Sequence, residues 1–117
     1  MTYAAIVKLA RTLPGVEEST SFGTPSLKVK GKFMARLKED SMTLVIKASF
    51  VVRDHLVRTA SDVFFITDHY RDYPAVLVRI AKVDRDTIVQ LLEDAWRDVA
   101  PKSLVRAFES QQNRQGA

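Results

Sequence analysis

The chain has 117 residues, of which 46% are hydrophobic, and it contains only 4 glycines and 4 prolines. This length and composition fit one compact domain with a single core. The chain has no cysteine, which excludes disulfides, thiolate metal sites and a cysteine nucleophile. No segment reaches the ~18 apolar residues of a membrane span, and Lys8 and Arg11 interrupt any signal-peptide core. We therefore expect a cytoplasmic protein that makes no membrane contact.

The first predicted element is a helix over residues 2–13. Apolar residues recur there at three- and four-residue intervals, Thr2 is a typical N-cap, and Pro14-Gly15 ends the pattern. The next segment, residues 17–24, combines an acidic pair with hydroxyl side chains and a Phe-Gly step. This composition favours a turn-rich connection that leads into a sheet.

Three antiparallel strands are predicted between Ser26 and Lys47, because apolar residues there alternate with a period of two. A three-residue loop at residues 30–32 would place the apolar residues of the first hairpin on one face of the sheet. A two-residue loop would shift the pairing by one residue and turn half of them to the other face. The alternation favours the three-residue loop. The residues placed on the shared face are Leu27, Val29, Phe33, Ala35, Leu37, Met42, Leu44 and Ile46.

A second helix is predicted to begin after the N-cap Ser49 and to end near residues 61–62, with Arg53 facing water. Residues 63–66 and 75–80 follow as two further strands. Both runs are rich in β-branched and aromatic residues, which indicates strands near the centre of the sheet.

The strongest helical pattern begins after the N-cap Asp84 and ends at Pro101, and this helix is expected to cover the sheet with Trp96 in the core. A short last helix through Phe108 and a polar, frayed tail at residues 110–117 complete the chain. These elements predict an α+β fold in one domain, residues 1–109. Its single antiparallel sheet has the order α-β(3)-α-β(2)-α, with the helices packed on one face and a short C-terminal helix.

Basic side chains concentrate on the first hairpin. Residues 26–47 contain six basic and two acidic residues, and their local net charge of +4 equals that of the whole chain. A basic β-ribbon of this kind can contact a phosphate backbone. The alternative is that exposed strands carry lysine to prevent edge-to-edge association. The long helix is acidic, which would make the molecule electrically two-sided. The candidate nucleic-acid-binding residues are Lys28, Lys30, Lys32, Arg36, Lys38 and Lys47.

The polar and aromatic connector at residues 67–74 joins two predicted strands and is a favoured place for a binding site. We predict a pocket in which His69, Tyr70, Tyr73 and Arg79 stack on a flat ligand or meet an anion. In the alternative interpretation, the tyrosines pack against the sheet and the loop is closed by hydrogen bonds.

No complete catalytic or metal-binding constellation is visible. Asp68-His69 resembles half of a hydrolytic pair, but no serine stands in a nucleophile-elbow setting. The two histidines, His55 and His69, lack the spacing of a metal site. We therefore predict no catalytic residues, no metal and no cofactor, and a protein that is not an enzyme.

Several short motifs in order along the chain resemble the MmcQ/YjbR family. They are Leu13-Pro14-Gly15-Val16-Glu17-Glu18, Phe22-Gly23-Thr24-Pro25, Thr67, His69-Tyr70, Tyr73-Pro74 and Leu77-Val78-Arg79. The resemblance covers about residues 4 to 105. It implies an α+β domain with a frataxin-like or secretion-chaperone-like arrangement, and a DNA-binding role that rests on shape and similarity.

Two functions are compatible with these patterns. The first is a non-enzymatic DNA-binding domain that uses the basic hairpin for phosphate contacts with low sequence specificity. The second is a module that binds a protein or a small anionic ligand through the Thr67–Pro74 loop and the sheet face.

Overall fold

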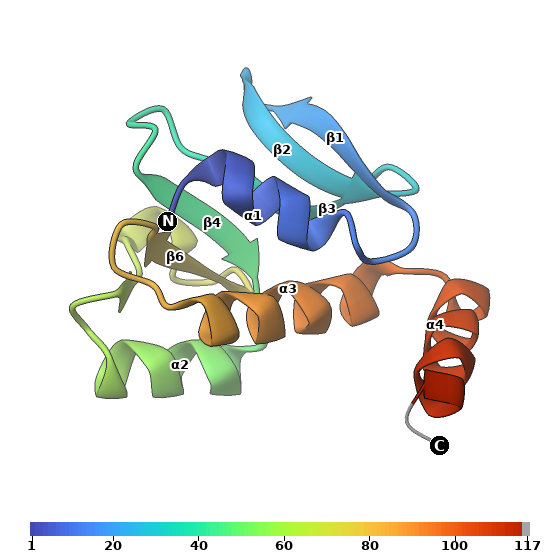
Figure 1. The fold of residues 1–117 in the computed structure, drawn as a ribbon. Helices are drawn as coiled ribbons and strands as arrows, with labels where there is room; N and C mark the ends of the chain where they lie inside the picture. The colour runs from blue at the N-terminus through green and yellow to red at the C-terminus, as the bar shows by residue number, and fades with distance from the viewer. Residues whose placement is uncertain (116–117) are drawn as a thin grey trace.

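Six strands form one antiparallel sheet in the computed structural model, which describes residues 1–115 (Figure 1). The strands lie in the order β1-β2-β3-β4-β6-β5. This confirms the predicted α+β class with a single antiparallel sheet. The strand bounds are Val16–Ser21 for β1, Thr24–Val29 for β2, Lys32–Leu37 for β3, Thr43–Lys47 for β4, Phe64–Phe65 for β5 and Ala75–Arg79 for β6.

The helices cover one face of this sheet. Helices α1 and α3 lie across it side by side, and α4 follows α3 at the edge of the molecule (Figure 1). Apolar residues of α2 join the same core cluster as those of α1 and α3, which confirms the predicted packing on one face. The bounds are Tyr3–Ala10 for α1, Phe50–Thr59 for α2, Arg85–Val99 for α3 and Lys102–Gln115 for α4, with a 3₁₀ turn, η1, at Asp68–Tyr70.

All three predicted N-caps form. Thr2, Ser49 and Asp84 each accept a hydrogen bond from the backbone N–H three residues on, over 3.1, 3.2 and 3.0 Å. The Asp84 carboxylate also accepts from the Thr87 hydroxyl at 2.6 Å. The hydrogen bonds from Thr87 hold the pKa of Asp84 below its ordinary value. Each cap satisfies a donor that the first turn leaves unpaired, which is why the starts of these helices can be predicted locally.

The prediction of turns at residues 17–24 is wrong, because most of this segment is strand β1. Only Phe22 and Gly23 form the turn, and Glu17 lies opposite Lys28 in the β1–β2 pairing. β1 is an edge strand of polar residues, so no alternation of apolar residues announces it. Four strands therefore separate α1 from α2, where three were predicted.

The loop between β2 and β3 also differs from the prediction. Val29 pairs with Lys32, so the loop has two residues, Lys30 and Gly31, with φ of 52° and 79°. Positive φ at both positions matches the right-handed twist of the strands. A two-residue loop by itself would turn the apolar residues of β3 to the opposite face from those of β2. A β-bulge, which shifts the register between Leu27 and Lys28, prevents this for the part of β3 beyond the bulge.

The bulge inserts Met34 as an extra residue, and both Met34 and Ala35 reach the core. Ala35 and Leu37 therefore share the helix-covered face with Leu27, as predicted. Phe33 does not, and it packs instead in a small cluster on the opposite face.

Strand β5 and helix α4 both differ from the prediction. β5 is a two-residue edge strand, and only β6 is an interior, buried strand as predicted for both. α4 extends to Gln115 and so includes most of the predicted frayed tail. The rest of that tail, residues 116–117, lies outside the described residues.

Trp96 anchors α3 in the core. Its side chain is 0% exposed, its indole N–H donates to the Pro14 carbonyl at 2.7 Å, and its ring packs edge-on against Phe108. The residue thus ties α3 to the end of α1 and to α4.

Replacing Trp96 by Ala should lower the free energy of unfolding by about 3 to 5 kcal/mol, since it leaves a large cavity and orphans the Pro14 carbonyl. Urea denaturation measures this. Val89→Ala, on the exposed side of the same helix, should change stability little. Equal effects of the two substitutions would contradict the placement of Trp96.

Tyr3 carries a buried hydroxyl that has no hydrogen-bond partner among the described residues. Burial, with a contribution from the nearby Glu18 carboxylate, raises the pKa of Tyr3 to about 12. The folded state therefore favours the neutral phenol. This contribution to stability is complete below the unfolded pKa of about 10 and is lost as pH rises toward 12.

Tyr3→Phe should be as stable as wild type or slightly more stable at neutral pH, since it removes an unpaired buried hydroxyl. It should also remove part of the alkaline destabilisation between pH 10 and 12. Urea midpoints across this range test both expectations. A variant that is destabilised at neutral pH, or that keeps the full alkaline slope, would show that the hydroxyl has a partner.

Candidate binding groove

The face of the sheet opposite the helices carries a groove of about 1100 Å³. Within the described part of the chain, no helix lies across this face. The walls are the β1–β2 hairpin and the segment around η1, and one end is closed by the last residues of α3. The basic side chains that line the groove are Lys28, Lys32, Arg36 and Lys47, and the aromatic ones are Phe22, Phe33, His69, Tyr70 and Tyr73.

The floor of the groove results from the β-bulge in β3. Beyond the bulge, Arg36 lies opposite Ser26, and before it Phe33 lies opposite Lys28. Both Phe33 and Arg36 consequently line the groove. In a regular strand, two residues three positions apart point to opposite faces, because successive side chains alternate. The bulge at Met34 changes this alternation and brings Phe33 and Arg36 to the same face.

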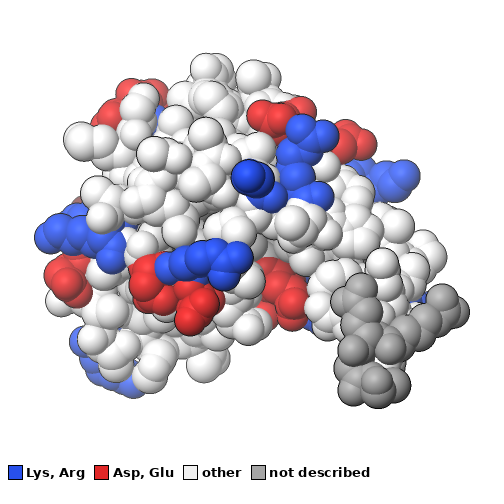
Figure 2. Space-filling view, viewed as in Figure 1, with Lys and Arg blue, Asp and Glu red and all other residues white. Residues whose placement is uncertain are grey.

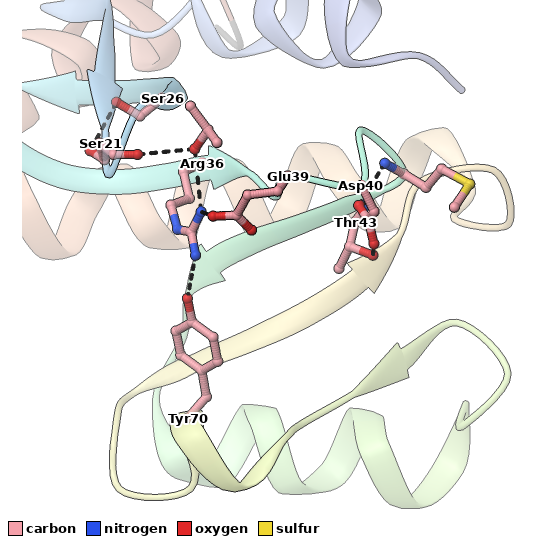
Figure 3. Close-up of polar contacts among 9 residues, drawn as sticks. Ser21, Ser26, Arg36, Glu39, Asp40, Thr43 and Tyr70 are labelled. Carbon is pink, nitrogen blue, oxygen red and sulfur yellow. Dashed lines mark hydrogen bonds and ion pairs between the residues drawn. The ribbon is translucent and has the colours of Figure 1, made fainter.

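Arg36 is buried, with 7% of its surface exposed. Its guanidinium donates to the Thr24 hydroxyl at 3.2 Å, to the Glu39 carboxylate at 3.3 Å and to the Tyr70 hydroxyl at 2.9 Å (Figure 3). Burial works against the charged form, but the hydrogen bonds and charges of Tyr70 and Glu39 outweigh it and raise the pKa of Arg36. The prediction that Arg36 faces solvent on the outward side of the hairpin is therefore wrong. The hydrogen bonds of Arg36 hold the fold together, because they join β3 on the floor of the groove to the η1 segment in the wall.

A second buried arginine, Arg53 of α2, holds the wall in place. One of its terminal nitrogens, Nη1, donates to the carbonyls of Tyr70, Arg71 and Tyr73 at 3.3, 2.8 and 3.1 Å. Its Nε donates to Asp54 at 2.9 Å. The sequence predicted that Arg53 faces water, yet it is 7% exposed. Its partners lie 17 to 20 residues away along the chain, so helical periodicity alone gives no sign of them.

Three of the four predicted pocket residues come together. The His69 ring lies 4.8 Å from Tyr70, edge-on, and 6.0 Å from Tyr73, nearly parallel. The Tyr70 and Tyr73 rings are 6.3 Å apart. Tyr73 is exposed to solvent, whereas Tyr70 is partly buried. The cluster offers an aromatic wall with polar tips along the groove.

Arg79 does not join this cluster. It lies at the far end of β6, four residues beyond Ala75, a separation of about 13 Å along a strand. Its guanidinium lies 4.1 Å from the Phe65 ring centroid and donates to the Ser61 carbonyl at 3.3 Å. Both partners are at the β5 edge of the sheet, outside the groove lining.

The predicted lysines have different surroundings. Lys28 donates to the Thr20 carbonyl at 3.1 Å, and Lys47 pairs with Asp98 at 3.0 Å. Lys30 and Lys32 are exposed at the hairpin tip, and Lys38 is partly buried past the end of β3. Within the described residues, no hydrogen bond or ion pair involves the side chain of Lys30, Lys32 or Lys38. The tip therefore presents two unpaired positive charges at one end of the groove.

Phe22 lines the groove, although the sequence identified it only as part of a family motif and of a turn. It is 86% exposed, its φ is 54°, and its ring centroid lies 5.3 Å from the Arg36 guanidinium carbon. Positive φ in a bulky residue costs on the order of 1–3 kcal/mol. The Phe-Gly step marked a turn correctly, but it gave no sign of the contact with Arg36.

Charge on the helix-covered side is mixed. The face seen in Figure 2 carries acidic and basic side chains next to one another, so the predicted division into an acidic and a basic side is not visible there. Ion pairs account for part of this mixing, since Arg97 contacts both Glu93 and Glu109. Within residues 1–115, no cluster of three or more metal-ligating side chains occurs, and no helix has the length and apolar character needed to cross a bilayer.

The structure defines an α+β domain with one uncovered sheet face. Residues 11–98 match the YjbR family, and the chain belongs to this family, which confirms the resemblance noted in its sequence. It is also similar to uncharacterised proteins of Mycobacterium bovis and of two Mycobacterium tuberculosis strains, each 42% identical over 57 residues. That stretch is 49% of this chain and 44% of each relative. The match thus spans less than half the length of these curated relatives.

Arg53→Met should lower the free energy of unfolding by about 2 to 3 kcal/mol, because it removes the donor from three loop carbonyls while it keeps most of the side-chain volume. It should also speed amide hydrogen exchange in residues 68–75. Arg58→Met, on the exposed side of α2, serves as the control. Unchanged exchange in the Arg53 variant would mean that the loop is held by other contacts.

Proposed function

We propose that the groove binds single-stranded nucleic acid with low sequence specificity. The observation that carries this proposal is the combination of exposed aromatic rings and basic side chains along one uncovered sheet face. Proteins that bind single strands without sequence preference combine a basic track for the backbone with aromatic platforms for the bases. A duplex keeps its bases stacked inside, where the rings of Tyr73 and Phe22 cannot reach them. This is why we favour a single strand over duplex DNA.

The backbone of the strand would follow the lysines. Lys30 and Lys32 at the tip, with Lys28 and Lys47 in the groove, give a short basic track, and Lys38 lies past the far end of β3. Arg36 is removed from the predicted set because its guanidinium serves the fold. Lys47 contributes less than a free lysine, since Asp98 neutralises part of its charge. We infer about three to five phosphate contacts.

A module for a peptide or a small anionic ligand is the second candidate. The Lys47–Asp98 pair favours it, because both signs of charge at one end of a groove suit a ligand that is not uniformly negative. His69 and Tyr73 would then make the main contacts. The function proposed in either case is binding without catalysis. A cytoplasmic location and a frataxin-like or secretion-chaperone-like arrangement stay predictions from the sequence.

Binding of a labelled single-stranded oligonucleotide should weaken with salt. For about three to five neutralised phosphates, the slope of log affinity against log salt should be about −2 to −3.5. Charge reversal of Lys30 and Lys32 to Glu should weaken binding strongly and lower the magnitude of this slope. Fluorescence anisotropy across a salt series measures both quantities.

The matched control reverses Lys8 and Lys102, two exposed lysines on α1 and α4, and so makes the same change in net charge. It should bind far better than the tip variant. If the two double variants bind equally, the attraction is non-specific and the groove is not the site. If the tip variant keeps full affinity for a peptide or metabolite isolated with the protein, the second candidate is correct.

A further inference from the structure

We propose that Phe22 is a base-stacking residue at the rim of the groove, held there by Arg36. This inference rests on the proposed binding of single strands and adds a contact residue and a subsite to it. The ligand unit at this subsite is a flat, π-bonded ring such as a nucleobase, which would lie on the solvent-facing side of the Phe22 ring.

The backbone of Phe22 is the first reason. Its turn, Phe22-Gly23, has φ of 54° and 78° and connects β1 to β2 through two residues. Turns of this kind favour Asn or Asp before Gly, because these residues tolerate positive φ. The other non-glycine residues with positive φ among those described are Lys30 and Ser41, which are polar. A bulky aromatic in such a position is destabilising, and an observed outlier of this kind points to a function.

The surroundings of the ring are the second reason. Phe22 is 86% exposed, so burial of its own surface does not explain the choice of an aromatic. One interaction fixes the ring, the contact at 5.3 Å with the Arg36 guanidinium. Arg36 is itself immobilised by Thr24, Glu39 and Tyr70. The contact with Arg36 thus orients the ring within a groove lining that also includes Lys28, Tyr70 and Tyr73, which lowers the entropy cost of stacking a base on it.

Phe22→Asn gives the sharpest test, because stability and binding should move in opposite directions. Asn-Gly suits the turn, so the urea midpoint should rise, while affinity for an eight-thymidine single strand should fall about 5- to 50-fold, the loss of one stacked base. Ser41→Asn relieves a similar backbone conformation (φ 59°) outside the groove lining. That control should be as stable as wild type or more stable, and it should bind normally.

Phe22→Trp provides a direct readout of contact. The indole should retain or improve affinity, and its emission should be quenched as the oligonucleotide is added, since a stacked base lies against it. Val51→Trp, at an exposed position on α2 outside the groove, should show no quenching beyond that of the native Trp96. Quenching only in the Phe22 variant supports the subsite.

These experiments distinguish a wrong role for Phe22 from a wrong function for the whole groove. If wild type does not bind single strands, both fall. If wild type binds and reversal of Lys30 and Lys32 abolishes binding, but Phe22→Asn binds like wild type, the groove stands and the stacking role of Phe22 is refuted. A lower urea midpoint for Phe22→Asn would likewise overturn it, since the aromatic would then be kept for stability.

Discussion

The loop that forms one wall of the groove depends on the buried guanidinium of Arg53. Arg53 donates to the carbonyls of Tyr70, Arg71 and Tyr73, and the same loop carries the His69, Tyr70 and Tyr73 rings. A loop at the edge of a sheet has few apolar contacts of its own, and its backbone groups must find partners. Because one cation satisfies several carbonyls at once, it fixes the backbone of the loop without a regular element. These hydrogen bonds tie the backbone of the loop that carries the aromatic wall to helix α2.

Arg36 plays the complementary role on the other side. Its guanidinium donates to Thr24, Glu39 and Tyr70, and only 7% of the residue is exposed. These partners come from the first residue of β2, the turn after β3 and the η1 segment, so one side chain connects the floor with both walls (Figure 3). A charge so deeply buried is tolerated because it is hydrogen-bonded on several sides. Its contact with the Phe22 ring connects the rim of the groove to the same network of hydrogen bonds.

Interactions between residues close in sequence could be predicted, whereas contacts between residues distant in sequence could not. The caps Thr2, Ser49 and Asp84 act within three residues, and each was identified correctly. The clustering of His69, Tyr70 and Tyr73 follows from their proximity in one short loop. Arg79 was grouped with them by sequence distance, but a strand carries it away from the loop. The sequence places Arg36 and Arg53 on the surface, because the partners that bury them, Tyr70 above all, become neighbours only in the folded chain.

The β-bulge explains why the prediction put Phe33 on the wrong face of the sheet. It also brings Phe33 and Arg36 together on the floor of the groove. Alternation in the sequence placed Phe33 in the core, and a single extra residue, Met34, moved it to the open face. A bulge has no strong local signal, because it depends on how two strands pair. Its consequence is functional: the open face gains an aromatic ring beside Lys28, and the core keeps Leu27 and Ala35 in register.

The most direct test of the central claim maps the bound strand onto the molecule. Backbone amide chemical shifts should be recorded by NMR while a short single-stranded oligonucleotide is added. Our account predicts shifts in β2, β3, the two hairpin turns and residues 68–75, with little change in α1 and the exposed side of α3. Shifts confined to the helices, or no shifts at concentrations well above the protein's, would contradict binding on the open face of the sheet.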